Sequence, residues 1–270
     1  MHIFRWWILG TVVLLNFANY AHWIAFPAVA KKVVISFLKS CLYCKINTFQ
    51  AAAYYDVSGE ALDLIPTVSY AAGVPTCLIA TYLIESRGLK TGIKIGAYLT
   101  GVGGLLCCLS TFPGISDYIP KVYQYYLAVI GQGITGVACP FISGVPTKIS
   151  QHWFPDRQRT MATSLLGMSY PLGIVLGQGV TPSLVQLPSD IPYMNIGFFV
   201  PALIGAILGI ILVKSNLPPT PPSASEEQRE MDENENMKKY PMFLLFIFYH
   251  FVVEWITLEL SRTYSPTEPL

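Results

Sequence analysis

Long stretches without a single charged residue alternate with short charged segments along most of this chain. Six of the charge-free windows reach the ~20 residues that a helix needs to cross a bilayer. They are Trp6–Ala30, Leu64–Ile84, Ile95–Ser116, Val122–Thr147, Thr160–Ser189 and Ile191–Val213. Their apolar runs are continuous, whereas the strands of a membrane barrel alternate. Because backbone groups in hydrocarbon must bond within their own segment, the pattern predicts an all-α integral membrane bundle of six helices.

The segment between the fourth and fifth windows, residues 151–159, carries one acid, two arginines and a proline that stops helices. An arginine at the bilayer centre costs roughly 2.5–3.5 kcal/mol even on insertion scales. Charges are therefore expected in the connections, and this segment is predicted to form a water-exposed turn.

Composition supports a membrane protein rather than a soluble one. The chain is 53% hydrophobic and 12% charged, against about 25% charged residues in an ordinary soluble domain. Its net charge of +1 gives no indication of a nucleic-acid partner, and the lipid bilayer is the expected surrounding. No nucleophile elbow, zinc-protease motif or phosphate loop occurs, and the four histidines are scattered. We expect neither an enzyme nor a bound cofactor or metal.

Glycines recur at spacings that suit close helix packing. Gly131, Gly133 and Gly136 match the dinucleotide pattern G-x-G-x-x-G, but that pattern has meaning only between a strand and a helix. Here it falls inside a charge-free window, so we expect it to pack helices. Small residues four apart let membrane helices approach one another. Such pairs occur at Gly92 and Gly96, Ala97 and Gly101, Gly173 and Gly177, and Gly205 and Gly209.

Basic residues gather in alternate connections between the windows, and the positive-inside rule assigns these to the cytosol. They are Arg5, Arg87, Lys90, Lys94, Lys148, Arg157, Arg159 and Lys214. The N-terminus is therefore expected in the cytosol, and we expect the plasma membrane rather than an organelle. Residues 31–50 do not follow this rule, because they carry four lysines in a connection that is expected on the opposite side of the membrane. The first window also resembles a signal peptide, but polar residues interrupt it and we expect it to be retained.

The six cysteines fall into two groups. Cys41 and Cys44 form a lone C-x-x-C in residues 31–50. This motif alone is too weak a signal for a metal site. The two cysteines could form a disulfide or remain as free thiols. Four others lie inside the windows, where we expect them to pack as small apolar residues. These are Cys77, Cys107, Cys108 and Cys139.

The first window carries polar and aromatic residues on one face. Asn16, Asn19, Tyr20 and Trp23 stand at i, i+3, i+4 and i+7 of a helix, and Gln132 is a polar residue in the middle of the fourth window. These side chains either hydrogen-bond neighbouring helices or line a path for a solute. Aromatic rings could then bind an organic cation, at ~0.5–2 kcal/mol each.

Several motifs together resemble one transporter family. The turn of Glu85, Arg87, Gly88 and Lys90 resembles the connection between helices two and three of major facilitator transporters. The first-helix stretch LLNFANYAHW (14–23), the turn WFPDRQR (153–159) and the exit PPTPPSA (218–224) resemble the family of the feline leukaemia virus subgroup C receptor. The similarity is greatest to its less characterised, major-facilitator-domain-containing branch.

This resemblance implies transport of a small organic solute by alternating access, with choline, ethanolamine or haem as family substrates. Trp23 falls where choline-transporting members use a first-helix tryptophan, whereas their fifth-helix glutamine falls at Pro171. Glu85 stands where the family has an aspartate. The resemblance implies that the turn clasps the second half of a transporter. The residues expected to act in this conformational turn are Glu85, Arg87, Gly88, Lys90, Arg157 and Arg159.

The sequence divides into three regions. Residues 1–215 are expected to form the six-helix bundle, the N-terminal half of a major facilitator fold, with 31–50 as a possible insertion. Residues 216–239 are proline-rich and then acidic, which is typical of a solvated cytosolic linker, and 240–270 resemble a truncated seventh hydrophobic segment with a polar tail. The solute site of such transporters lies between two halves. We therefore expect a C-terminal half, a second copy or a full-length transporter as partner; alternatively, the chain is a truncated isoform that regulates a full-length transporter without transporting.

Overall fold

The computed structural model describes residues 2–30 and 50–215, and within these ranges all regular structure is helical. Six helices are long and apolar enough to cross a membrane, which confirms the predicted number and the all-α class. They are α1 (His2–Ala30), α3 (Gly59–Arg87), α4 (Leu89–Thr111), α5 (Lys121–Ser143), α7 (Asp156–Leu184) and α8 (Ile191–Leu212). The connections hold two short helices, α2 (Gln50–Tyr55) and α6 (Pro146–Trp153), and two 3₁₀ turns, η3 (Ser116–Tyr118) and η4 (Pro188–Asp190).

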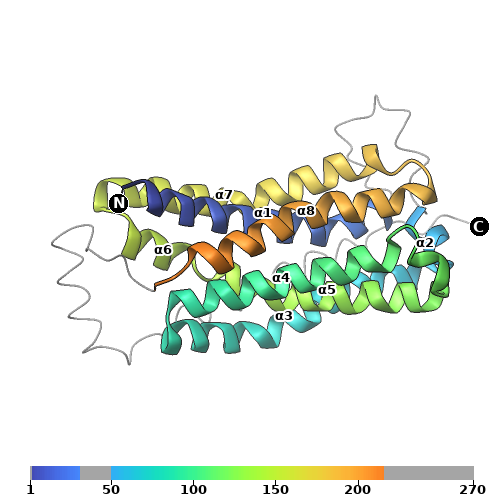
Figure 1. Cartoon of the computed structure of the whole chain (residues 1–270), viewed down its shortest axis with the longest axis horizontal. Helices are drawn as coiled ribbons and strands as arrows, with labels where there is room; N and C mark the ends of the chain where they lie inside the picture. The colour runs from blue at the N-terminus through green and yellow to red at the C-terminus, as the bar shows by residue number, and fades with distance from the viewer. Residues whose placement is uncertain (1, 31–49, 216–270) are drawn as a thin grey trace, which may run out of the picture.

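The six long helices form one elongated bundle. Helix α1 packs on α7 and α8, α5 packs on α3 and α4, and α4 also packs on α8. Figure 1 shows α1, α7 and α8 running side by side along one edge of the bundle, with α3, α4 and α5 along the other. Helix α6 lies at the end that holds the N-terminus, and α2 lies at the opposite end.

Glycines bring several of these helices into backbone contact, as their spacing predicted. A Cβ atom on Gly173 of α7 would lie 2.6 Å from the carbonyl oxygen of Phe17 in α1. A Cβ on Gly131 of α5 would lie 2.8 Å from the carbonyl oxygen of Gly103 in α4. Because real Cβ atoms do not approach this closely, the glycines of the dinucleotide-like pattern serve helix packing.

The two ends of the bundle differ in charge. One apolar cluster gathers Ile8, Ile84, Ile149 and Val213, so the start of α1, the turn between α3 and α4, helix α6 and the end of α8 meet at one end. The basic residues predicted for the cytosol flank these elements, and we call this the basic end. Asp56, Asp63 and Asp190 belong to elements that meet at the opposite end, which we call the acidic end.

The connection between α5 and α7 differs from the prediction. The fourth window is divided, because α5 ends at Ser143 and a separate helix, α6, runs as far as Trp153. Trp153 and Phe154 are buried, although a water-exposed turn was predicted for residues 151–159. Their rings pack on the start of α1: the Phe4 and Trp153 centroids lie 6.3 Å apart and those of Trp6 and Phe154 5.0 Å apart. The prediction was wrong for this aromatic pair, because burial of ring area outweighs proximity to the charged residues.

Helix α2 covers the acidic end of the bundle. Tyr55 is fully buried there, and its hydroxyl lies 3.3 Å from the Ser110 hydroxyl of α4. This burial raises the pKa of the Tyr55 phenol above its ordinary value, so the phenol stays neutral. The Lys121 ammonium lies 3.9 Å from the ring centroid of Tyr54. Helix α2 is thereby attached to both α4 and α5.

Several predictions concern residues outside the described ranges. These are the possible insertion, apart from Gln50 at its end, with Cys41 and Cys44; the linker of residues 216–239; and the seventh segment and tail of residues 240–270.

Candidate solute site

A cavity with an empty volume of about 350 Å³ opens in the bundle beside α1. Three of the four residues predicted on the polar face of α1, namely Asn19, Tyr20 and Trp23, line it. Helices α3 and α5 complete the described lining with Ser69, Tyr70, Thr135, Gly136 and Cys139. Seven of the eight lining residues lie at least seven residues from the ends of their helices, and Cys139 lies four residues before the end of α5.

Two pairs of aromatic rings lie in or next to the lining of this cavity. The Trp23 ring meets that of Tyr70 edge to face, with centroids 4.9 Å apart and an interplanar angle of 78°. The Tyr20 ring meets that of Tyr170 from α7, with centroids 4.8 Å apart and an angle of 61°. Edge-to-face pairs hold each ring in a defined orientation. Helices α1, α3 and α7 thus bring four ordered rings to the cavity region.

The polar groups of the lining are neutral. The Asn19 amide donates to the Thr100 hydroxyl at 3.4 Å and to the Thr135 carbonyl at 3.2 Å, which ties α1 to α4 and α5. The Cys139 thiol donates to the Tyr20 hydroxyl at 3.3 Å. The Trp23 indole N–H has no hydrogen-bond partner among the described residues. The described lining contains neither acidic nor basic side chains, so it can hold a cation through rings and dipoles.

Gln132 lies behind this cavity, and the structure does not place it in the lining. It is fully buried. Its amide nitrogen lies 3.3 Å from the His22 carbonyl and 3.4 Å from the Trp23 carbonyl. Its amide oxygen accepts a hydrogen bond from the Thr135 hydroxyl at 3.1 Å. Gln132 therefore fixes the α1 backbone at Trp23 to α5.

Asn16 is also outside the described lining. It is buried on the same face of α1 as Asn19 and Tyr20, one turn closer to the basic end. Its side-chain oxygen has no hydrogen-bond partner among the described residues. Asn16 is thus a buried polar residue of α1 between the level of the cavity and the basic end.

The residues predicted for the conformational turn lie at the basic end. Gly88 joins α3 to α4 with φ 86° and ψ 170°, a backbone conformation that only glycine adopts without strain. Its N–H donates to the Ile84 carbonyl at 3.1 Å, which closes α3. Glu85 and Lys90 flank this corner half-buried, and Arg87 is exposed. The structure therefore explains the requirement for glycine in this turn.

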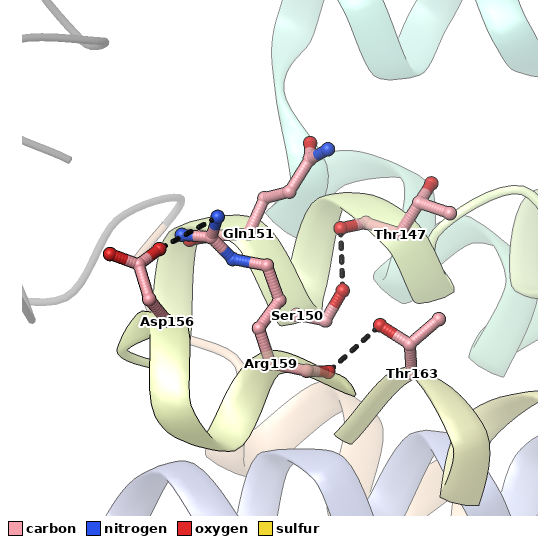
Figure 2. A network of polar contacts seen from close by, with 6 residues as sticks. All are labelled: Thr147, Ser150, Gln151, Asp156, Arg159 and Thr163. Atoms are coloured by element: carbon pink, nitrogen blue, oxygen red, sulfur yellow. Dashed lines mark hydrogen bonds and ion pairs between the residues drawn. The ribbon is translucent and has the colours of Figure 1, made fainter. Parts of the chain in front are cut away.

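Arg159 organises the second corner of the basic end, between α6 and α7 (Figure 2). Its guanidinium lies 3.0 Å from the Asp156 carboxylate and 3.5 Å from the Gln151 carbonyl, so it bridges the two helices. The Thr163 hydroxyl donates to the Arg159 carbonyl at 2.9 Å. Arg157, in contrast, is exposed. Neither corner contributes to the described lining of the cavity.

The sequence analysis predicted three of the eight residues that line the described cavity and missed the other five. Ser69 and Tyr70 are polar residues inside an apolar window, and Tyr170 follows the Met168–Ser169 pair in another; their presence in these windows was the available signal. Cys139 was predicted to pack as a small apolar residue, yet it lines the cavity and bonds Tyr20. The other three cysteines of the windows are buried, as predicted.

Comparison with known proteins shows similarity to membrane transporters. The profile of the Major Facilitator Superfamily matches residues 7–267. Solute carrier family 49 member A3 of Xenopus tropicalis is 32% identical over 221 residues, which cover 82% of this chain and 42% of that protein. The choline/ethanolamine transporter FLVCR1 of Felis catus is 27% identical over 215 residues, covering 73% of this chain and 36% of that protein.

The chain spans about two fifths of the length of these relatives. Among solved structures, a D-xylose–proton symporter superposes with a TM-score of 0.50 at 16% identity, covering 87% of this chain and 54% of the symporter. This likeness supports the fold alone.

Proposed function

The chain belongs to the Major Facilitator Superfamily, and on this premise we propose that its aromatic cavity binds a small organic solute that is carried across the membrane by alternating access. The observation that carries the proposal is the set of ordered rings around a cavity without charged lining residues. Solute sites of such transporters lie near the bilayer midplane, at the interface of two helix bundles. The mid-helix position of this cavity agrees with that location.

An amine of the choline and ethanolamine type is the solute we favour. Relatives are named choline/ethanolamine transporters, and the faces of Trp, Tyr and Phe rings attract organic cations.

Uptake of labelled choline, ethanolamine and haem tests this proposal. Cells that express the chain should accumulate one of the amines above the level of vector-transfected cells, with saturable kinetics. If none of the three is taken up, and the chain instead co-purifies with a full-length relative and lowers its flux, the chain is a non-transporting regulator. The turn that contains Glu85 and Gly88 and the α6–α7 corner that contains Arg159 would then dock on a partner without contributing to transport.

The partner that completes the cavity is a further part of this proposal. Relatives are more than twice as long as the matched part of this chain, so a second bundle would face α1, α3, α5 and α7. A C-terminal half, a second copy of this chain or a full-length transporter could supply it. Peptide mass spectrometry of the detergent-purified complex distinguishes these partners, because a second copy gives only peptides of this chain, whereas a C-terminal half or a full-length transporter gives others.

We also propose that the basic end lies in the cytosol and that the chain functions in the plasma membrane. Eight basic residues flank the elements of this end, which the positive-inside rule assigns to the cytosol. Epitope tags beside Arg87 and Arg157 should both be stained only after permeabilisation of the cells. A tag beside Gly114 should be stained on intact cells. Staining of the Arg87 and Arg157 tags on opposite sides would contradict the six-span topology.

A further inference from the structure

Helix α1 contains a proline four residues after the cavity residue Trp23. Pro27 lies within this helix, which runs from His2 to Ala30, and proline has no backbone N–H. In an α-helix the carbonyl of each residue accepts a hydrogen bond from the N–H four residues later. The backbone at position 27 therefore cannot donate to the Trp23 carbonyl. A carbonyl in a membrane helix then needs another donor, because hydrocarbon supplies none.

The side chain of Gln132 in α5 supplies a donor at this place. Its amide nitrogen lies 3.4 Å from the Trp23 carbonyl oxygen and 3.3 Å from the His22 carbonyl oxygen. Its amide oxygen faces donors instead, namely the Thr135 hydroxyl at 3.1 Å and the Cys107 thiol at 4.0 Å. A reversed amide would place its oxygen against two carbonyl oxygens, so these neighbours determine which way the amide points. Gln132 is fully buried, and water cannot take over its role as donor.

The backbone of Gln132 holds α3 as well. The Ser69 hydroxyl of α3 donates to the Gln132 carbonyl at 2.7 Å. Ser69 precedes Tyr70, whose ring meets that of Trp23 edge to face with centroids 4.9 Å apart. Gln132 thus bonds the residue that carries one ring of this pair and the neighbour of the residue that carries the other. Helix α5 thereby holds α1 and α3 at the level where the two rings meet.

A purely structural explanation of Gln132 is also available. Amide side chains hydrogen-bond between membrane helices and hold them together. Asn195 of α8 is a residue of this kind: its amide nitrogen lies 3.3 Å from the Cys107 carbonyl and 3.0 Å from the Thr111 hydroxyl of α4. Asn195 does not belong to the described lining of the cavity. A residue that only joins helices affects the stability of the bundle, whereas a residue that positions Trp23 also affects solute affinity and the surroundings of the Trp23 ring.

We propose that Gln132 is a positioning residue for the solute site: it replaces the donor that Pro27 lacks and so holds the Trp23 ring against Tyr70. This inference rests on the proposed solute-binding function of the cavity. It assigns Gln132 no contact with the solute, in agreement with its place outside the described lining. Because Gln132 acts through the Trp23 carbonyl, its contribution should depend on the residue at position 27.

A double-mutant cycle with Pro27 tests this dependence in cells that take up an amine. Methionine is unbranched like glutamine but has no amide, so Gln132→Met removes the donor with little change of shape. We expect the KM for labelled choline to rise about 3- to 10-fold, the range that corresponds to one hydrogen bond, while the maximal rate per transporter stays within about twofold. Pro27→Ala restores an N–H to the helix. In that background Gln132→Met should change KM by less than about twofold, because the Trp23 carbonyl then keeps a donor.

Fluorine NMR of the Trp23 ring is a second measurement, and it needs no solute. The full chain is labelled with 5-fluorotryptophan and purified in detergent, and the Trp23 signal is assigned by its absence in Trp23→Phe. Gln132→Met should shift or split this signal, because the ring loses its fixed position against Tyr70. The signal of Trp7, which is exposed on the outside of the bundle, should not move. Adding Pro27→Ala should return the Trp23 signal toward its original position.

Asn195→Leu provides the matched control. It also removes a buried amide that joins two helices, so it should lower Tm, but it should leave KM within about twofold and the Trp23 signal in place. Equal effects of Asn195→Leu and Gln132→Met on KM would assign Gln132 a structural role and overturn the proposal. An effect of Gln132→Met that is the same with proline and with alanine at position 27 would also overturn it. If Gln132→Met folds in neither background, Gln132 serves stability alone and the proposal is wrong.

The two measurements separate this inference from the proposed function. If no amine is taken up, but the Trp23 signal moves in Gln132→Met and recovers with Pro27→Ala, the transport function fails while the positioning role stands. If an amine is taken up and its KM is unchanged in Gln132→Met, the inference fails alone. An unchanged Trp23 signal in Gln132→Met overturns the inference in either case.

Discussion

Replacing Trp23 with alanine is expected to raise the KM for amine uptake roughly 10- to 30-fold. The reason is that a cation–π contact in a desolvated site contributes up to about 2 kcal/mol to binding. A tenfold change in affinity corresponds to about 1.4 kcal/mol. The variant also removes the partner of the Tyr70 ring, which Trp23 meets at 4.9 Å. Initial rates of labelled choline uptake over a range of concentrations measure this change. Trp23→Phe keeps a ring and should recover most of the affinity.

Trp7→Ala is the control for this prediction. Trp7 belongs to the same helix but is 59% exposed on the outside of the bundle, where lipid would surround it. Its replacement should leave KM within about twofold. If Trp23→Ala and Trp7→Ala have equal effects, or if Trp23→Ala lowers only the amount of protein in the membrane, then the aromatic cavity is not the solute site.

Gly136→Ala is expected to be the most destabilising of the single-methyl additions in the bundle. A Cβ at this position would lie 2.6 Å from the Cα of Ser69 and would clash with the Ser69 carbonyl. Backbone atoms cannot turn aside as a flexible side chain can, so α3 must move away from α5. Overpacking of this kind typically costs about 1–3 kcal/mol. Because 1 kcal/mol shifts Tm by roughly 2–4 °C in a chain of this size, we expect Tm to fall by several degrees in detergent.

Gly10→Ala provides a matched control in α1. A Cβ there meets no atom within 4 Å, so only helix propensity changes, and alanine is favoured over glycine by up to about 1 kcal/mol. Tm should therefore stay constant or rise slightly. An equal fall of Tm in both variants would show that added side-chain volume, rather than the contact of α5 with α3, determines stability.

The number of membrane helices could be predicted because the relevant physics is local. Charges are excluded from hydrocarbon wherever they occur along the chain. Each charge-free window therefore predicts a membrane span by itself, whatever helices pack beside it. The corner of α6 could not be predicted in this way. Trp153 and Phe154 stand next to a proline and three charges in the sequence, and their burial depends on Phe4 and Trp6, which are about 150 residues away in the chain.

The site shows the same division between local and distant information. Helical periodicity grouped Asn19, Tyr20 and Trp23 on one face of α1, and all three line the cavity. Periodicity could not identify which residues of other helices face these three, because no single window contains information on which helices are neighbours. Gln132 is polar and buried for the reason considered as an alternative: it bonds the backbone of α1 and does not line the cavity.

The reaction of Cys139 with a water-soluble thiol reagent tests most directly whether the cavity is a solute site. Cys139 lines the cavity, whereas Cys107 is fully buried between α4 and α5 and its thiol donates to the Ala128 carbonyl at 3.6 Å. A reagent dissolved in water can therefore reach Cys139 only if the cavity opens to water. A solute that binds between the rings should slow this reaction, and it should leave the reaction of an exposed cysteine introduced at Ser58 unchanged.

The deciding measurement is the rate at which trimethylammonioethyl methanethiosulfonate modifies Cys139 in the membrane-embedded chain, with and without saturating choline. We expect modification that is lost in Cys139→Ser and is slowed several-fold by choline. Modification at a rate that choline does not change, or no modification at all, would contradict a solute cavity formed by α1, α3 and α5.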